Sequence, residues 1–357
     1  MRPVKYSIEI DSEALMHFDS VIDVRSPAEF AEDHVPGAIN CPVLDNEERA
    51  RIGTLYKQSP FEAKKVGAAL VARNIARHLE AEFVGKPRGW RPLVYCWRGG
   101  KRSGAMAHVL REIGWDARTL EGGYKSYRRY VLERLAQLPS ELDFRVIHGV
   151  TGCGKSRLLH ALAAAGAQVL DLEGLAAHRG SVLGNLPDRA QPTQKTFESL
   201  LLSALGSFDA ARPVFVEGES KKIGQLHLPD ALIERMRAAE CVLLEAGLAT
   251  RVALLTDEYR HFFADRAALD AQLDCLIGLH GRERVREWQA LGARGEWAEL
   301  VRRLLEEHYD PAYRRSAMRN FAQLPQARTL HVTSPDENSF ARLAGALLER
   351  IDERLPA

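Results

Sequence analysis

The sequence has little that would place the chain outside a reducing, aqueous compartment. It holds five cysteines among 357 residues, an odd number without regular spacing, so a disulfide framework is not expected. No uninterrupted apolar run approaches the roughly 20 residues that a membrane-spanning helix needs. Residues 1–11 also lack the charged and apolar pattern of a secretory signal. We therefore expect a cytoplasmic protein with free thiols and no membrane contact.

An excess of charge of one sign is also lacking. The chain has 49 Lys and Arg residues against 48 Asp and Glu residues, which excludes the strong global field of a highly basic nucleic-acid-binding protein. A polyanionic partner would have to be bound by a local basic patch. At 357 residues the chain is longer than one hydrophobic core usually serves, so two domains are predicted.

A cysteine loop organises the first half of the chain. The apolar run 92–95 predicts a buried strand that delivers Cys96 to its end, and residues 103–113 have a helical pattern. The predicted oxyanion loop between them consists of Trp97, Arg98, Gly99, Gly100, Lys101, Arg102 and Ser103. Loop amides, a helix N-terminus and nearby cations all favour a thiolate and attract an oxyanion. Cys96 is therefore the candidate nucleophile, and the alternative is a buried cysteine that only ends a core strand.

Strands and helices alternate around this loop. Further strands are predicted at residues 20–24 and 117–120, and helices after Ser26, at 61–83 and at 124–138. Ser26 and Glu29 have the spacing of a capping box. The alternation predicts a parallel α/β sheet with the reactive loop at the carboxyl edge of its strands.

Four segments in this order resemble the rhodanese family. They are residues 23–30, residues 34–40, the Cys96 loop and residues 120–123. The resemblance implies a rhodanese-like domain whose loop cysteine accepts sulfur or selenium as a persulfide-type adduct. The loop differs from the commonest rhodanese form, because six residues separate Cys96 from Ser103. Its Cys-x5-Arg-Ser spacing also fits cysteine phosphatases, and that alternative stays open.

The second half begins with a phosphate-binding motif. A linker at residues 136–140 divides the chain into a domain of residues 1–138 and a domain of residues 142–357. The motif G-x-x-x-x-G-K-[ST] follows a predicted strand and precedes a predicted helix, which is the context of a P-loop. Its phosphate-binding residues are Gly149, Gly152, Gly154, Lys155 and Ser156. The glycines let backbone amides surround a phosphate chain, to which Lys155 adds a positive charge.

The remainder predicts a P-loop NTPase-like α/β domain with a helical C-terminal part. Its other strands are expected at residues 168–172, 213–217, 241–245 and 329–332, with a mobile insert at 178–195 and helices over 248–320. The locally cationic stretch Tyr313, Arg314, Arg315 and Arg319 suits the phosphates of a nucleic acid. The alternative is that these arginines only solvate a surface. Glu219 could hold a cation or pair with a neighbouring lysine.

The order of the two domains, together with residues 178–181, 217–224 and 309–313, resembles the tRNA 2-selenouridine synthase family. The resemblance implies a substrate tRNA with 2-thiouridine at the wobble position of its anticodon loop. A geranyl group from geranyl diphosphate would first be added to the sulfur. Selenium from selenophosphate, supplied by a selenophosphate-producing enzyme, would then replace the geranylated sulfur.

The same resemblance assigns roles to residues. It implies that Cys96 is the selenium-carrying cysteine and that residues 149–156 are the phosphate cradle. We place the prenyl diphosphate in that cradle. No tightly bound cofactor and no resident metal ion are expected, and a need for Mg²⁺ is left open.

Two other kinds of function fit the same motifs. One is a rhodanese-type sulfurtransferase or Cys-x5-Arg phosphatase fused to a nucleotide kinase-like domain. The other is a nucleotide-sensing binding module with an inactive thiol. A kinase would turn over ATP without RNA, whereas a tRNA-modifying transferase would change the wobble nucleoside.

Overall fold

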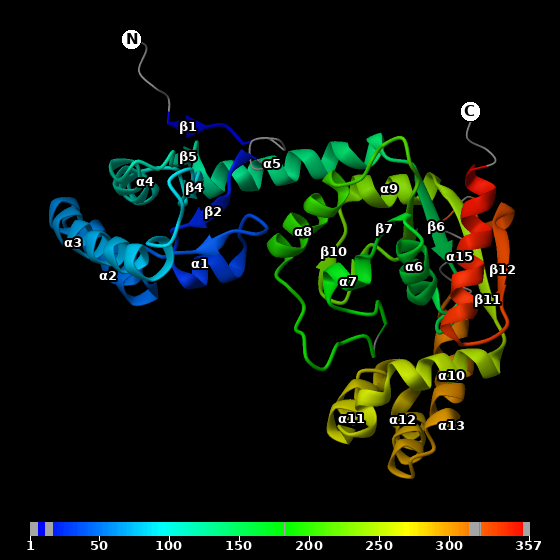
Figure 1. Cartoon of the computed structure of the whole chain (residues 1–357). Helices are drawn as coiled ribbons and strands as arrows, with labels where there is room; N and C mark the ends of the chain where they lie inside the picture. Colours follow the sequence, from blue (N-terminus) through cyan, green and yellow to red (C-terminus); the bar gives the residue numbers. More distant parts are fainter. Residues whose placement is uncertain (1–5, 11–16, 182, 314–320, 322, 353–357) are drawn as a thin grey trace. The chain divides into compact units, whose positions relative to one another are not determined.

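The computed structural model describes residues 6–10, 17–181, 183–313, 321 and 323–352 (Figure 1). The chain divides into two compact units. Residues up to Arg134 form the first unit together with Thr193–Gly206, and the remaining residues form the second. Each unit contains a parallel five-stranded sheet with helices, so the predicted α/β class with parallel sheets is confirmed.

The first sheet has the order β1-β5-β4-β2-β3, and all its pairings are parallel. Its strands are β1 Ser7–Ile8, β2 Ser20–Asp23, β3 Ile39–Asn40, β4 Pro92–Tyr95 and β5 Arg118–Leu120. The central strand β4 is buried along its whole length. Val94 pairs with Ile22 on one side and with Thr119 on the other. This register places the residue that follows β4 at the carboxyl edge of the sheet.

Helices accompany the sheet in the first unit. They are α1 Pro27–Glu32, α2 Asn46–Gln58, α3 Pro60–His78, α4 Lys101–Ile113, α5 Gly123–Gln137 and α8 Gln194–Gly206. Ile75 of α3 and Leu110 of α4 pack in one core with Ile22 of β2 and Val94 of β4. Helix α8 is joined to α5 by the ion pair between Arg128 and Glu198.

Three local expectations for this unit need correction. The helix expected at 61–83 is α3 followed by a π-helical turn, Leu79–Phe83. Helix α2 was not predicted, because it buries no residue and has little apolar periodicity. Its start was readable nonetheless, since Asp45 and Glu48 form a capping box. Helix α4 begins at Lys101, two residues earlier than expected, so the loop after Cys96 is shorter.

The second sheet has the order β12-β11-β6-β8-β7 and is also parallel. Its strands are β6 Phe144–His148, β7 Gln168–Leu170, β8 Val214–Glu217, β11 Glu240–Ala246 and β12 Arg328–Val332. Ile147 lies in register between Glu217 of β8 and Val242 of β11. The P-loop that follows β6 therefore shares the carboxyl edge with Glu217. A separate hairpin joins β9 Lys222–Ile223 to β10 Leu226–His227.

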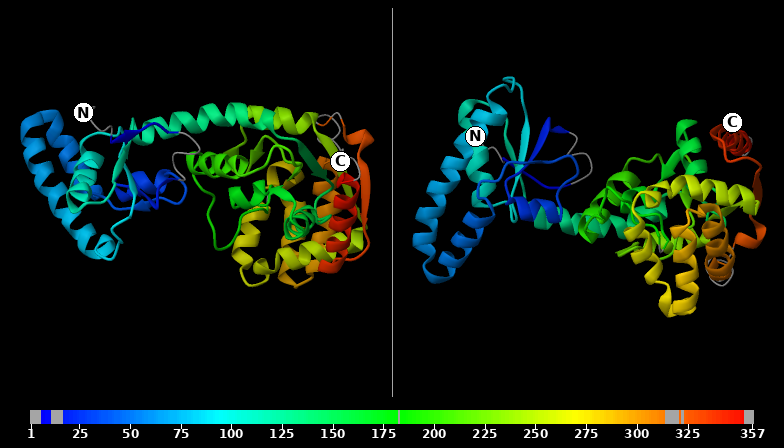
Figure 2. Two further views of the ribbon diagram at one scale, coloured as in Figure 1. Left: turned by 45° about the horizontal axis from the view of Figure 1, so that its top comes forward. Right: turned by 90° about the horizontal axis from the view of Figure 1, so that it is seen from below.

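The helices of the second unit form two groups. They are α6 Lys155–Ala164, α7 Leu172–Ala176, α9 Asp230–Ala238, α10 Leu248–Glu258, α11 Arg266–Asp274, α12 Ile277–Ala293, α13 Trp297–Leu304 and α15 Glu337–Asp352. Helices α6 and α15 share a core with β11 and β12, and the views in Figures 1 and 2 show α15 beside β12. The helical part from α10 to α13 has its own core around the fully buried Trp288.

The helical C-terminal part was predicted, whereas α7, α9, α15 and the hairpin were not. The strand expected to continue to residue 172 ends at Leu170, because Asp171 caps α7 by accepting the N–H of Gly174 at 2.7 Å. Among the residues that the structure describes, no helix is long and apolar enough to cross a membrane.

A buried ion pair lies under the first sheet's carboxyl edge. The Arg25 guanidinium is 1% exposed and lies 2.6 Å from the fully buried Asp23 carboxylate. It also donates to the backbone oxygen of Asp33 at 2.6 Å and lies 3.9 Å from the centre of the Tyr124 ring. The pair thus joins β2 to the end of α1 and the start of α5.

Arg25→Ala should lower the free energy of unfolding of the first unit by about 3–5 kcal/mol, because it leaves the Asp23 carboxylate buried without its partner. The measurement is urea unfolding followed by circular dichroism. Arg91→Ala is the matched control, since Arg91 pairs with Asp19 at the surface, and it should cost less than about 1 kcal/mol. Equal losses for the two variants would contradict the prediction.

Candidate active sites

Cys96 lies at the end of β4 and faces a ring of hydrogen-bond donors. Its Sγ accepts the backbone N–H of Gly100 at 3.3 Å and the hydroxyl of Ser103 at 3.3 Å. Ser103 is fully buried in the first turn of α4, and Cys96 is 4% exposed. The thiol is therefore held at the bottom of a short loop that runs directly into a helix N-terminus.

The loop favours a thiolate. Burial by itself would raise the pKa of the Cys96 thiol, but hydrogen bonds from Ser103 and from the backbone of Gly100 and Arg98 outweigh burial and lower the pKa. The sequence pointed to loop amides, a helix N-terminus and three nearby cations. Arg98 and Lys101 are instead exposed, and Arg102 is paired with Glu29 at 3.0 Å. Of these groups, the hydrogen-bond donors account for the lowered pKa of Cys96.

The first turn of α5 fixes the shape of the Cys96 loop. The backbone N–H of Tyr124 donates to the carbonyl of Cys96 at 2.8 Å, and that of Lys125 donates to Trp97 at 3.0 Å. A Cβ atom on Gly123, whose φ is +60°, would lie 2.2 Å from the Cys96 oxygen. Gly99 has the same constraint, because its Cβ would meet the Leu120 oxygen at 2.4 Å. Glycine is therefore needed on both sides of this contact.

Aromatic and acidic side chains support the loop. Trp97 lies against Tyr124 with ring centres 5.3 Å apart, and the Tyr124 hydroxyl donates to the buried Asp33 carboxylate at 2.8 Å. Sequence reasoning did not assign a role to Asp33 or Tyr124. The signal was available for Tyr124, because it directly follows the Gly-Gly pair that marks the turn.

The P-loop has the backbone that its motif predicts. Gly152 and Gly154 have φ values of +79° and +92°, and a Cβ on Gly154 would lie 2.4 Å from the Phe340 ring. Lys155 begins α6, and its Nζ donates to the carbonyl of Gly149 at 3.2 Å. The hydroxyl of Ser156 donates to Glu173 at 3.1 Å. The five predicted phosphate-binding residues are thus all on one loop and the helix turn that follows it.

Acidic groups surround Lys155. Burial and the nearby Glu219 raise the pKa of Glu173 to about 8, and burial raises the pKa values of Glu217 and Glu219. Burial alone would lower the pKa of Lys155, but the neighbouring Cys153, Glu173 and Glu219 raise it. Glu217 is 1% exposed, and its Oε2 has no hydrogen-bond partner. This edge of the sheet can therefore accept a cation or a proton at Glu217.

The helical part holds the P-loop from the other side. The Arg251 guanidinium is buried and donates to the carbonyl of Thr151 at 2.9 Å and to the Asp310 carboxylate at 2.6 Å. Tyr313 lies beside the backbone of Gly149. Residues 309–313, which contributed to the family resemblance, thus stabilise the phosphate cradle. Arg251 was missed because nothing in a helical run of arginines distinguishes it.

The predicted tRNA-binding group is only partly visible. Arg314, Arg315 and Arg319 lie outside the described residues. Tyr313 is half-buried, and its position near Gly149 places it at the P-loop. The neighbouring Tyr309 is half-buried against the core of the helical part.

Two segments of the family resemblance meet at a polar cavity of about 420 Å³. Its lining residues come from the insert after α7 and from the β9–β10 hairpin: His178, Gly180, Ser181, Asn185, Gln191, Lys222, Gly224 and Gln225. A Cβ on Gly180 would lie 2.7 Å from Glu219. The cavity therefore adjoins the acidic groups beside Lys155.

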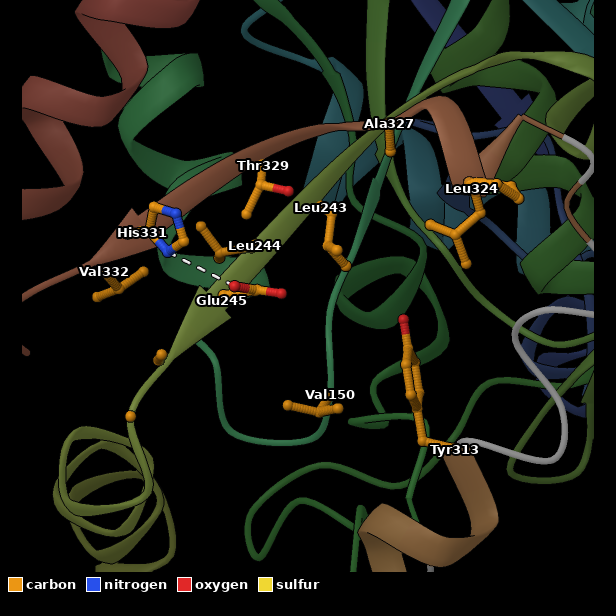
Figure 3. A pocket seen from close by; sticks show the side chains of 13 residues that line it. Val150, Leu243, Leu244, Glu245, Tyr313, Leu324, Ala327, Thr329, His331 and Val332 are labelled. Carbon is orange, nitrogen blue, oxygen red and sulfur yellow. Dashed lines mark ion pairs between the residues drawn. The ribbon is translucent and has the colours of Figure 1, made fainter.

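A second, larger cavity lies next to the P-loop on β11 and β12, with a volume of about 830 Å³ (Figure 3). Most of its lining is apolar. Val150 of the P-loop and Tyr313 form one side, and Leu243, Leu324 and Ala327 face them.

Comparisons with known proteins give a family match for each half of the chain. Residues 9–130 match the rhodanese-like domain family, and residues 142–274 match the family described as tRNA 2-selenouridine synthase AAA domain. Three curated relatives are each named tRNA 2-selenouridine synthase. The protein of Nitrosomonas europaea is 38% identical over 67% of this chain and 63% of its own length. Those of Alcanivorax borkumensis and Shewanella halifaxensis are 36% and 34% identical over 82% of this chain and cover 88% and 87% of their own lengths.

Ser103→Ala should shift the alkylation of Cys96 by iodoacetamide to higher pH. The variant loses the hydroxyl that donates to Sγ, so the pKa of the thiol should rise and less thiolate should be present at neutral pH. The measurement is the rate of alkylation against pH, with the labelled cysteine identified by mass spectrometry. An unchanged midpoint would show that the backbone donors alone hold the thiolate.

The experiment needs a background in which Cys96 reacts alone. Cys275 is exposed, so Cys275→Ser removes the competing thiol. Burial raises the pKa of Cys41 to about 12 and that of Cys241 to about 11, and it also raises the pKa of Cys153. These three buried thiols should stay unreactive over the pH range of the titration.

Proposed function

This chain belongs to the tRNA 2-selenouridine synthase family, and on that premise we propose that it converts wobble 2-thiouridine of tRNA into 2-selenouridine through an S-geranyl intermediate. The observation that supports this most is the presence of a thiolate-favouring loop and a phosphate cradle in one chain. Geranyl diphosphate and selenophosphate are the proposed co-substrates. Both reagents have phosphate groups that such loops bind.

The first step is proposed at the P-loop. The sulfur of 2-thiouridine attacks C1 of the prenyl diphosphate, the C1–O bond breaks, and diphosphate leaves while the base loses its N3 proton. Lys155 and the N-terminus of α6 stabilise the negative charge of the leaving group. No water needs activation, so this role does not require the catalytic base of an ATPase.

A Mg²⁺ ion that arrived with the diphosphate would use few protein ligands. Among the described residues, no group of three or more His, Cys, Asp or Glu side chains is arranged to hold a metal by itself. The Ser156 hydroxyl and Glu173 lie together at the cradle, and the buried Oε2 of Glu217 has no partner. These groups fit an ion whose other ligands are phosphate oxygens and water, and such an ion would neutralise charge on the leaving group.

Geranylation activates the base for the second step. It converts the thiocarbonyl into a thioether, so that a thiolate can leave when a nucleophile adds at C2. Selenium in selenophosphate is already at the selenide level. Forming an S–Se bond at Cys96 would therefore require the removal of two electrons, whereas attack on phosphorus requires no oxidant.

We accordingly propose that the Cys96 thiolate attacks the phosphorus of selenophosphate. The Se–P bond breaks, hydroselenide leaves and adds at C2, and geranylthiolate is expelled. Water then hydrolyses the S–P bond and restores Cys96 with release of phosphate. The loop amides that hold Sγ are suited to the phosphate oxygens, and the Cys-x5-Arg-Ser spacing is the one that phosphatases use.

Cys96→Ser should abolish the conversion to 2-selenouridine and leave geranylation within about twofold of wild type, because it removes only the nucleophile of the second step. Mass spectrometry of nucleosides from treated tRNA measures both products. Cys275→Ser is the control and should retain both steps. Normal 2-selenouridine formation by the Cys96 variant would remove this cysteine from the mechanism.

Lys155→Ala should lower kcat/KM for geranylation by about 100-fold or more, because it removes a charge that stabilises the leaving diphosphate. The same variant should still convert tRNA that already has S-geranyl-2-thiouridine. Loss of both steps would indicate a structural defect. Rapid ATP hydrolysis without RNA would favour the nucleotide kinase alternative.

A further inference from the structure

We propose that the 830 Å³ cavity on β11 and β12 binds the hydrocarbon chain of the isoprenoid diphosphate (Figure 3). This inference rests on the proposed prenyl transfer and assigns a binding site to one part of its substrate. The ligand class is an acyclic isoprenoid chain attached to a diphosphate. Such a ligand needs an apolar cavity next to a phosphate cradle, and the second unit contains both features.

The lining has the chemistry that a hydrocarbon chain requires. Leu243 of β11 and Ala327, the residue before β12, project into the cavity, and Leu324 lies beside them (Figure 3). The charged groups form one pair, Glu245 and His331, whose atoms are 3.5 Å apart and whose side chains are both more than half exposed. The described lining thus offers mainly apolar surface, together with the hydroxyls of Thr329 and Tyr313 and one ion pair.

The cavity adjoins the phosphate cradle. Val150 lines it and is the residue directly after Gly149, the first glycine of the P-loop. Tyr313 also lines it, and its hydroxyl lies close enough to the Gly149 backbone and to Lys155 for both to affect its pKa. A ligand with its diphosphate on the P-loop amides could therefore extend its chain past Val150 and Tyr313.

The alternative occupant is a nucleotide base, as expected for a kinase-like domain. A base needs hydrogen-bond donors and acceptors along its edge. The cavity offers the hydroxyls of Thr329 and Tyr313 and the Glu245 carboxylate, but most of its lining residues are apolar. A hydrocarbon chain needs none of these groups. Each methylene that it buries should strengthen binding about fourfold, because its transfer from water is worth about 0.8 kcal/mol.

The test is the dependence of prenyl transfer on chain length. Dimethylallyl, geranyl and farnesyl diphosphate are each supplied with the same 2-thiouridine-containing tRNA, and kcat/KM is measured for wild type, Leu243→Trp and Ala327→Phe. Filling the cavity should lower kcat/KM for geranyl and farnesyl diphosphate by about tenfold or more and that for dimethylallyl diphosphate by less than about threefold. Inhibition by inorganic diphosphate should not change, because the cradle is intact.

A second variant guards against loss of folding. Leu243→Ala enlarges the cavity and should shift the preference toward farnesyl diphosphate, an effect that a damaged fold does not produce. Leu279→Trp is the matched control, because Leu279 is an exposed residue of α12 outside the cavity. It should keep the wild-type preference.

The outcomes separate this inference from the proposed function. If wild type geranylates tRNA but all cavity variants keep its chain-length preference, the cavity assignment is overturned and the proposed function stands. If wild type transfers no prenyl group from any diphosphate, both are overturned. If ATP binding is weakened by Leu243→Trp more than geranyl diphosphate binding, the cavity is a nucleotide site and the assignment is also overturned.

Discussion

Parallel pairing around one buried central strand is the constraint on which both units depend. Strand β4 is held between β2 and β5, and strand β6 between β8 and β11. Parallel strands all end at one edge, where backbone groups are no longer paired with a neighbour. Each central strand then leads through a short loop into a helix N-terminus. The N–H groups of that loop are directed at a thiol in one unit and are available to a phosphate in the other.

Close backbone contacts keep these loops in place. The Cys96 loop is hydrogen-bonded to the start of α5, and the contact leaves no room for a Cβ atom on Gly99 or Gly123. The P-loop is held through Thr151 by Arg251, whose charge is balanced by Asp310. Both loops are thus fixed by residues distant in the chain. This preorganisation lets neutral donors stabilise the Cys96 thiolate.

The two units suit the two reagents of the proposed reaction. One offers a thiolate with amide donors for a small oxyanion, and the other offers a phosphate cradle flanked by a polar and an apolar cavity. Family membership supports a single overall modification of tRNA. The geometry of each unit supports the assignment of prenyl transfer to the P-loop and of the release of selenide from selenophosphate to Cys96.

The sequence by itself determined the α/β class, the position of Cys96 at a strand end and the P-loop, because each depends on local periodicity and on glycines at fixed spacing. Only the tertiary structure showed that Ser103 stabilises the thiolate, that Arg102 pairs with Glu29, and that Arg251 holds the P-loop. These are contacts between segments whose separation along the chain says nothing of their distance in space. The cavity beside Val150 also depends on the tertiary structure. Its walls come from β11, β12 and residues elsewhere in the chain.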